Sequence, residues 1–83
     1  MATEPIDTGA LIRQIGETLW GERWQAALSA ELGLNARTVR RLASGRQAPP
    51  IGVIEQLAEM VTDRRDELAE LTAVIEELRR RQA

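Results

Sequence analysis

Apolar residues recur every three to four positions along most of the chain, which is the spacing of one face of an α-helix. The first such run extends from about Thr8 or Gly9 to Leu19, and its apolar positions are Leu11, Ile12, Ile15 and Leu19. No segment shows the alternation of β-branched and polar residues that indicates a half-buried strand. The pattern therefore predicts an all-α protein.

The segment from Gln25 to Gly45 predicts two short helices joined by a three-residue turn. Five apolar residues occupy the positions that face each other when two such helices cross: Leu28, Leu32, Leu34, Val39 and Leu42. Gly33 can adopt the left-handed conformation that ends the first helix. Asn35 can cap the second helix by accepting a hydrogen bond from a free backbone N–H.

The two tryptophans stand just before this segment. Trp24 lies one turn before Leu28, so we expect it in the core, and we expect the same of Trp20. Because Trp24 is no helix cap, the first of the two helices should begin earlier, near Gly21 or Glu22.

After the loop that follows Gly45, one helix can run from Ile51 to about Arg81, with a break allowed near Thr62 and Asp63. Its apolar residues follow a heptad spacing that is interrupted at Arg64. We expect Ile54, Leu57 and Val61 to complete the core. Four later residues would then form an exposed apolar stripe: Leu68, Leu71, Ile75 and Leu78. A second copy of the chain would cover this stripe, and the alternatives are folding back onto the first helix or another protein partner.

The helix after Asn35 carries clustered arginines opposite its apolar residues. Val39 and Leu42 point inward, so the opposite face is shared by Ala36, Arg37, Arg40 and Arg41. Arginine can donate two hydrogen bonds to the O6 and N7 atoms of guanine. Such a charge run can also be an ordinary solvated face, but here it accompanies the two-helix pattern.

The combination of Gln25, Gly33, Asn35 and Gly45 with the apolar positions resembles the Cro and lambdoid-repressor family of helix-turn-helix proteins, also called XRE-like. Ser29 and Trp24 depart from the family pattern, in which an alanine and a capping residue are usual. The resemblance implies a four- to five-helix lambda-repressor-like helix-turn-helix domain with a C-terminal helical dimerisation extension. It divides the chain into a flexible N-terminus (1–8), a DNA-binding domain (9–61) and a dimerisation helix (62–83).

In this family, base readers come from the first two turns of the second motif helix. Arg37 and Arg41 are our candidates for reading bases, and Ala36 for contacting a thymine methyl group. The remaining candidates would hold phosphates, and these are Gln25, Asn35, Thr38, Arg40 and Arg46.

Composition narrows the class of protein further. A chain of 83 residues makes one small domain with an extension, and it contains no Cys and no His, so we expect no disulfide, no zinc site, no cofactor and no enzymatic activity. The net charge is -2, yet residues 35–50 hold four arginines and no acidic residue. This asymmetry favours a local nucleic-acid interface on an otherwise acidic protein.

Neither a signal peptide nor a membrane span is indicated by the sequence, so we expect a cytoplasmic protein of a bacterium or phage. The expected function is a dimeric repressor that binds double-stranded DNA at an inverted-repeat operator, including its own promoter. Alternatives are an antitoxin or anti-CRISPR-associated phage regulator, or a helical interaction module that uses the C-terminal helix.

Overall fold

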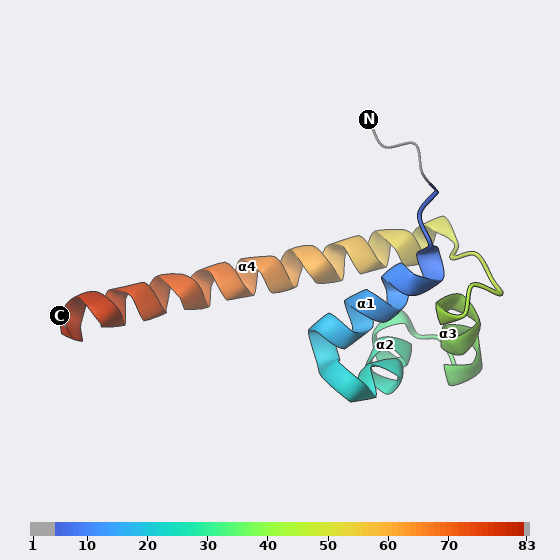
Figure 1. The fold of residues 1–83 in the computed structure, drawn as a ribbon, viewed down its shortest axis with the longest axis horizontal. Helices are drawn as coiled ribbons and strands as arrows, with labels where there is room; N and C mark the ends of the chain where they lie inside the picture. Colours follow the sequence, from blue (N-terminus) through green and yellow to red (C-terminus); the bar gives the residue numbers. More distant parts are fainter. Residues whose placement is uncertain (1–4, 83) are drawn as a thin grey trace.

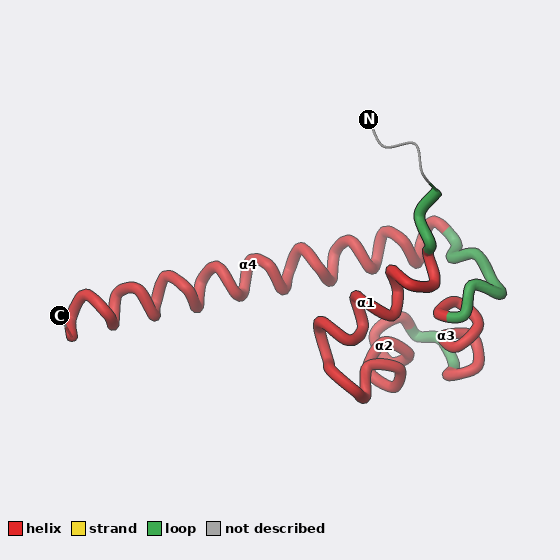
Figure 2. Tube along the Cα trace, viewed as in Figure 1, coloured by secondary structure: helices red, strands yellow, loops and turns green. Residues whose placement is uncertain are grey.

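A computed structural model of the chain describes residues 5–82, and this part is built entirely from helices and their connections (Figures 1 and 2). The elements are α1 (Thr8–Trp20), the short 3-10 helix η1 (Gly21–Arg23), α2 (Trp24–Leu32), α3 (Ala36–Ala43) and α4 (Ile51–Gln82). The described residues contain no strand, so the all-α prediction is confirmed. Of the expected flexible segment 1–8, residues 1–4 lie outside the described part, and Asp7 already caps α1.

The first three α-helices gather around one apolar core. Leu28, Val39 and Leu42 are fully buried, and Trp24 is 6% exposed. Trp20 and Leu34 pack against this core from its edge, as expected. Because each helix contributes buried residues at helical spacing, the core holds α1, α2 and α3 against one another.

Two glycines allow α1 to approach its neighbours closely. A Cβ atom at Gly9 would lie 2.7 Å from the Ala43 carbonyl oxygen, and one at Gly16 would lie 2.3 Å from the Trp24 ring. The Arg13 guanidinium, between these glycines, donates a hydrogen bond to that same Ala43 carbonyl. Thus α1 fixes the position of the C-terminal end of α3.

The connection between α2 and α3 consists of three residues, as predicted. Gly33 has φ 66° and ends α2 in the left-handed conformation. The Leu34 N–H donates to the Ser29 carbonyl at 3.0 Å, and the Ser29 hydroxyl donates to the Leu34 carbonyl. Asn35 then caps α3 by accepting from the Thr38 N–H at 2.8 Å. The expected start of the preceding helix near Gly21 corresponds to η1, a tighter turn that runs directly into α2.

Helix α4 is continuous over its 32 residues, with no break at Thr62 and Asp63. Its buried residues are Val53 and Leu57, and Met60 is partly buried. The expectation that Ile54 and Val61 complete the core is wrong, since they are 45% and 43% exposed. The prediction assumed a repeat of seven residues for two turns, as in a supercoiled helix. An ordinary helix has 3.6 residues per turn, so the residues that α4 turns toward α1 differ from those the heptad spacing selects.

The second half of α4 projects beyond the rest of the molecule (Figure 1). Leu68, Leu71, Ile75 and Leu78 are between 55% and 58% exposed, so the helix does not fold back to bury them on α1. The projecting half begins near Arg64, whose guanidinium donates a long hydrogen bond of 3.5 Å to the Leu19 carbonyl at the end of α1. Within the described residues, no helix combines the length and the apolar character that crossing a membrane requires.

Candidate nucleic-acid interface

Helix α3 has one buried and one exposed face. Val39, Leu42 and Ala43 are buried against α1 and α2. Opposite them, Arg37, Arg40 and Arg41 are exposed, as is Ala36 in the first turn. The strict separation of apolar and charged residues on this short helix therefore presents the arginines outward from a packed core.

The arginines around α3 differ from those of α4 in their partners. Arg64, Arg65, Arg79, Arg80 and Arg81 all form ion pairs with carboxylates of the same helix. In contrast, the side chains of four arginines form no ion pair and donate no side-chain hydrogen bond within residues 5–82: Arg37, Arg40, Arg41 and Arg46. Their donor groups are consequently available to an anionic ligand such as a phosphate or to the edge of a base.

The start of α3 brings two further candidate residues together. Asn35 uses its side-chain oxygen to accept from the Thr38 N–H, and it remains exposed. Capping leaves the amide NH2 group of Asn35 as a donor toward solvent. Thr38 is only partly exposed, so it is less accessible than the arginines. Gln25 is exposed in the first turn of α2.

The end of α3 holds Arg46 beside the helix. Gly45 has φ 80°, which reverses the chain, and the Arg46 N–H then donates to the Arg41 carbonyl at 3.0 Å. This 6→1 hydrogen bond is the Schellman arrangement of a helix end. It holds the exposed Arg46 beside the end of α3, although Arg46 belongs to the loop that follows this helix.

Sequence reasoning missed the residues that support this face from behind. Arg13 lies 30 positions before Ala43, whose carbonyl it contacts, and no local spacing connects the two. From the sequence, Ser29 was noted only as a departure from the family pattern, whereas its hydroxyl donates a hydrogen bond to the Leu34 carbonyl in the turn. Gly9 and Gly16 were missed because their function depends on which helix lies against α1.

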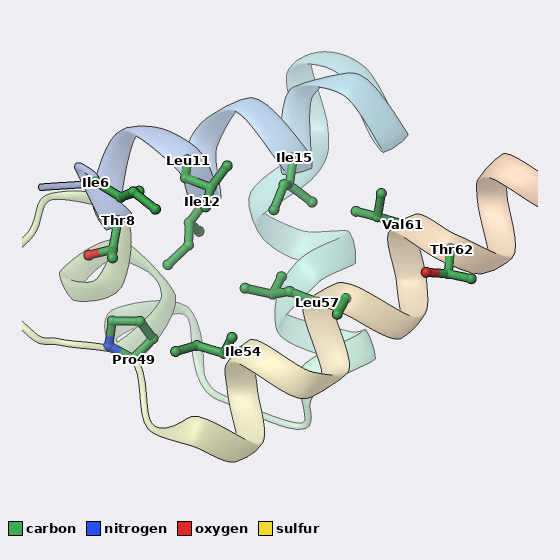
Figure 3. Close-up of a pocket in the computed structure, with 11 residues that line it drawn as sticks. Ile6, Thr8, Leu11, Ile12, Ile15, Pro49, Ile54, Leu57, Val61 and Thr62 are labelled. Carbon is green, nitrogen blue, oxygen red and sulfur yellow. The ribbon is translucent and has the colours of Figure 1, made fainter. Parts of the chain in front are cut away.

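An apolar groove of about 490 Å³ lies between α1 and α4, away from the arginine face (Figure 3). Its walls include Leu11 and Ile15 from α1 and Ile54 and Val61 from α4. Among the described residues that line it, none is charged, and none belongs to α3. The groove therefore has no part in the candidate interface.

Comparison of the chain with protein-family models, with curated proteins and with solved structures found no match. Residues 5–82 also contain no cluster of three or more side chains suited to binding a metal ion. The geometry alone thus defines the class of site, an arginine-rich helix face on a small all-α protein.

Proposed function

We propose that this protein is a sequence-specific regulator of transcription that binds double-stranded DNA with α3. The observation that carries the proposal is the exposed arginine face at α3, formed by Arg37, Arg40 and Arg41 of the helix and Arg46 just after it. Within residues 5–82 these four form no ion pair, while all five arginines of α4 are paired. A helix of this width fits the major groove, where base pairs are distinguishable. The helix pair α2–α3, with its three-residue turn, supports a helix-turn-helix reading of the fold and the resemblance to XRE-like regulators.

Within this proposal, Arg37 and Arg41 read bases. They are four residues apart on one helix, which is about 6 Å along its axis, close to two base-pair steps of about 3.4 Å. Ala36 contacts a thymine methyl group in the same groove. Phosphates on either side are held by Gln25, Asn35, Thr38, Arg40 and Arg46.

The charge distribution supports specific over general binding. The chain has a net charge of -2, yet residues 35–50 hold four arginines and no acidic residue. An acidic remainder repels DNA except where the arginine face meets it, so non-specific adhesion is weak. Two such faces in a dimer would bind the halves of an inverted repeat and prevent polymerase from using an overlapping promoter. This mode of repression includes the promoter of the protein's own gene.

The proposal is tested by fluorescence anisotropy with DNA from the upstream region of the gene, at two salt concentrations and against a scrambled duplex. Arg37→Ala and Arg41→Ala should each lower the affinity for the native duplex by about 10- to 100-fold, since a lost bidentate contact costs roughly 1–3 kcal/mol. The matched control is Arg65→Ala, which removes another exposed arginine, one that is paired with Asp66 on α4.

Equal binding of native and scrambled duplexes would remove autoregulation from the proposal. Unchanged affinity in both α3 variants would contradict α3 as the reading helix. If Arg65→Ala weakened binding as strongly as the α3 variants, the effect would be one of total charge and not of a defined interface.

A second candidate function rests on the apolar stripe of α4, which suits a protein-interaction module whose α2–α3 pair is only a scaffold. Such a module would tolerate Arg37→Ala and Arg41→Ala without loss. An antitoxin or anti-CRISPR-associated regulator would still need the α3 face, and so it is a narrower form of the DNA-binding proposal.

A further inference from the structure

The exposed stripe of α4 continues the face that α4 turns toward the core. Eighteen residues make five full turns of an α-helix. Adding 18 to the positions of Val53, Leu57 and Met60, which contact the core, gives Leu71, Ile75 and Leu78. The projecting half of α4 therefore points its apolar residues toward the side on which α1 and α2 lie.

This alignment restricts how a second helix can lie on the stripe. Helices α1 and α2 occupy the same side of α4 along its first half, up to the contact between Arg64 and Leu19 (Figure 1). A parallel partner would have to bring its own residues 51–64, with its attached helices, into this occupied space. An antiparallel partner directs only the C-terminal end of its α4 toward that space.

Charges at the two ends of the projecting half are complementary. A hollow where this half begins is lined by three carboxylates, from Glu31, Asp63 and Glu67, and by one cation, Arg64. The opposite end of the helix carries three successive arginines at 79–81. A parallel pair would bring the arginine-rich ends of the two copies together, whereas an antiparallel pair brings the arginine-rich end of each copy near the carboxylate-lined end of the other.

We propose that the projecting half of α4 binds a second copy of this chain in antiparallel orientation, over residues 67–82. This inference rests on the dimeric part of the proposed function and specifies its geometry. The two copies present equal apolar lengths to each other, so neither stripe extends past the other into solvent.

One register satisfies every apolar layer of this pair. Leu68 packs against the partner's Leu78, and Leu71 packs against the partner's Ile75, with the same two layers repeated by symmetry. The polar residue Gln82 meets the partner's Arg64, where the apolar residues end. On one flank Arg81 lies beside the partner's Glu67, and each of the two also has an oppositely charged partner on its own helix, Glu77 and Arg64 respectively.

The other flank brings Arg65 toward the partner's Arg79. Each of these arginines already has a carboxylate on its own helix, since Arg65 pairs with Asp66 at 3.4 Å and Arg79 pairs with Glu76 at 3.0 Å. Intrahelical pairing reduces the repulsion between the two exposed cations.

The orientation is tested with spin labels and pulsed electron paramagnetic resonance on the full chain. The sequence contains no Cys, so Glu59→Cys and Ala73→Cys each give one labelled site per copy. Both positions face away from the stripe on the helix. In the proposed register the two copies of residue 73 lie at the same height, whereas the two copies of residue 59 are separated along the pair by about 42 Å.

We expect a short distance for the label at 73 and a distance longer by tens of ångströms for the label at 59. Nearly equal distances at both sites would show a parallel pair and overturn the inference. A chain that stays monomeric in analytical ultracentrifugation at the concentration used for labelling would overturn it as well.

Charge reversal tests the flank contact independently. Glu67→Arg and Arg81→Glu should each raise the dissociation constant of the dimer about fivefold, and the double variant should restore it. Glu70→Arg is the control, because residue 70 lies outside the paired face, about 60° further around the helix from the stripe than residue 67. Additive losses in the double variant would contradict the register.

The outcomes separate this inference from the proposed function. Tight, specific DNA binding with equal label distances would leave the regulator proposal standing and the antiparallel pair refuted. An antiparallel pair without DNA binding would leave this inference standing and refute the regulator proposal.

Discussion

At the scale of single residues, the packing of α1 depends on glycine, which has no side chain to separate the helix from its neighbours. Gly16 accommodates the Trp24 ring, which is nearly buried, because a Cβ atom there would lie 2.3 Å from Cε3 and 2.6 Å from Cδ2 of the indole. A rigid ring inside a packed core has no alternative position nearby. At Gly52, in contrast, a Cβ atom would meet no other side chain or neighbouring element within 4 Å in the described part of the chain.

We therefore predict opposite effects of the same substitution at these two glycines. Gly16→Ala should lower the free energy of unfolding by about 2 kcal/mol, because overpacking outweighs the gain in helix propensity. Gly52→Ala should raise it by about 0.5 kcal/mol, because alanine restricts the unfolded chain without a clash. Urea unfolding at one protein concentration measures both, and a stabilised Gly16→Ala would show that Trp24 does not pack on α1 as described.

Local residues of the turn were predictable from sequence for a physical reason. Gly33 and Asn35 act through backbone atoms within a few positions of themselves, as the left-handed φ and the hydrogen bond from Thr38 confirm. Arg13 was not predictable, since its partner carbonyl belongs to Ala43 on another helix. The spacing of residues in the sequence predicts contacts within one helix or turn, but not contacts between helices that are distant in the chain.

At the scale of elements, α1 and α3 begin in the same way. The Asp7 carboxylate accepts from the Ala10 N–H at 3.0 Å, and the Asn35 side chain accepts from the Thr38 N–H at 2.8 Å. Both caps satisfy one of the free N–H groups of a helix start. The two helices differ in that only α3 carries the arginine face.

This pair of caps yields a matched prediction. Asp7→Ala and Asn35→Ala should each lower the free energy of unfolding by about 1 kcal/mol, measured by thermal or urea unfolding. Only Asn35→Ala should also weaken DNA binding in the anisotropy assay, because it loosens the helix that we propose reads bases and removes a phosphate donor. Equal losses of DNA affinity in both variants would assign the effect to stability alone.

The course of α4 shows where pattern reasoning at this scale succeeds and fails. The helix and its apolar stripe follow from periodicity, and Leu57 was correctly expected in the core. Val53 and Met60 were missed, and Ile54 and Val61 were misplaced, because a seven-residue spacing and a 3.6-residue turn diverge by about 20° per heptad. Which residues are buried depends on where α1 crosses α4.

At the scale of the whole molecule, the projecting half of α4 is the feature that a monomer leaves unexplained. Its four stripe residues are more than half exposed, although each is a large aliphatic side chain. A charged residue within a paired stripe would have to be buried without a partner, which is costly. The opposite side of the helix, which includes Ala73, would remain in solvent.

We predict that Leu71→Glu raises the dissociation constant of the dimer at least about 100-fold, while Ala73→Glu leaves it unchanged. Analytical ultracentrifugation measures the assembly, and circular dichroism checks that helix content is retained. Binding to a duplex with both operator halves should fall in Leu71→Glu alone. A dimeric Leu71→Glu would show that the copies associate through another surface.

By itself, the sequence determined the elements of this protein: the helices, the turn at Gly33, the cap at Asn35 and the arginine cluster all follow from interactions between residues close in the chain. Only the tertiary structure decided how these elements meet. It placed Arg13 on the end of α3 and fitted Trp24 against Gly16. Within residues 5–82 it left the α3 arginines without ion-pair partners, while those of α4 are paired. It also left part of one face of α4 exposed. Residues 18 positions apart lie on the same side of an α-helix, so the stripe continues the buried face of α4, but the neighbouring helices cover only the first half of that face.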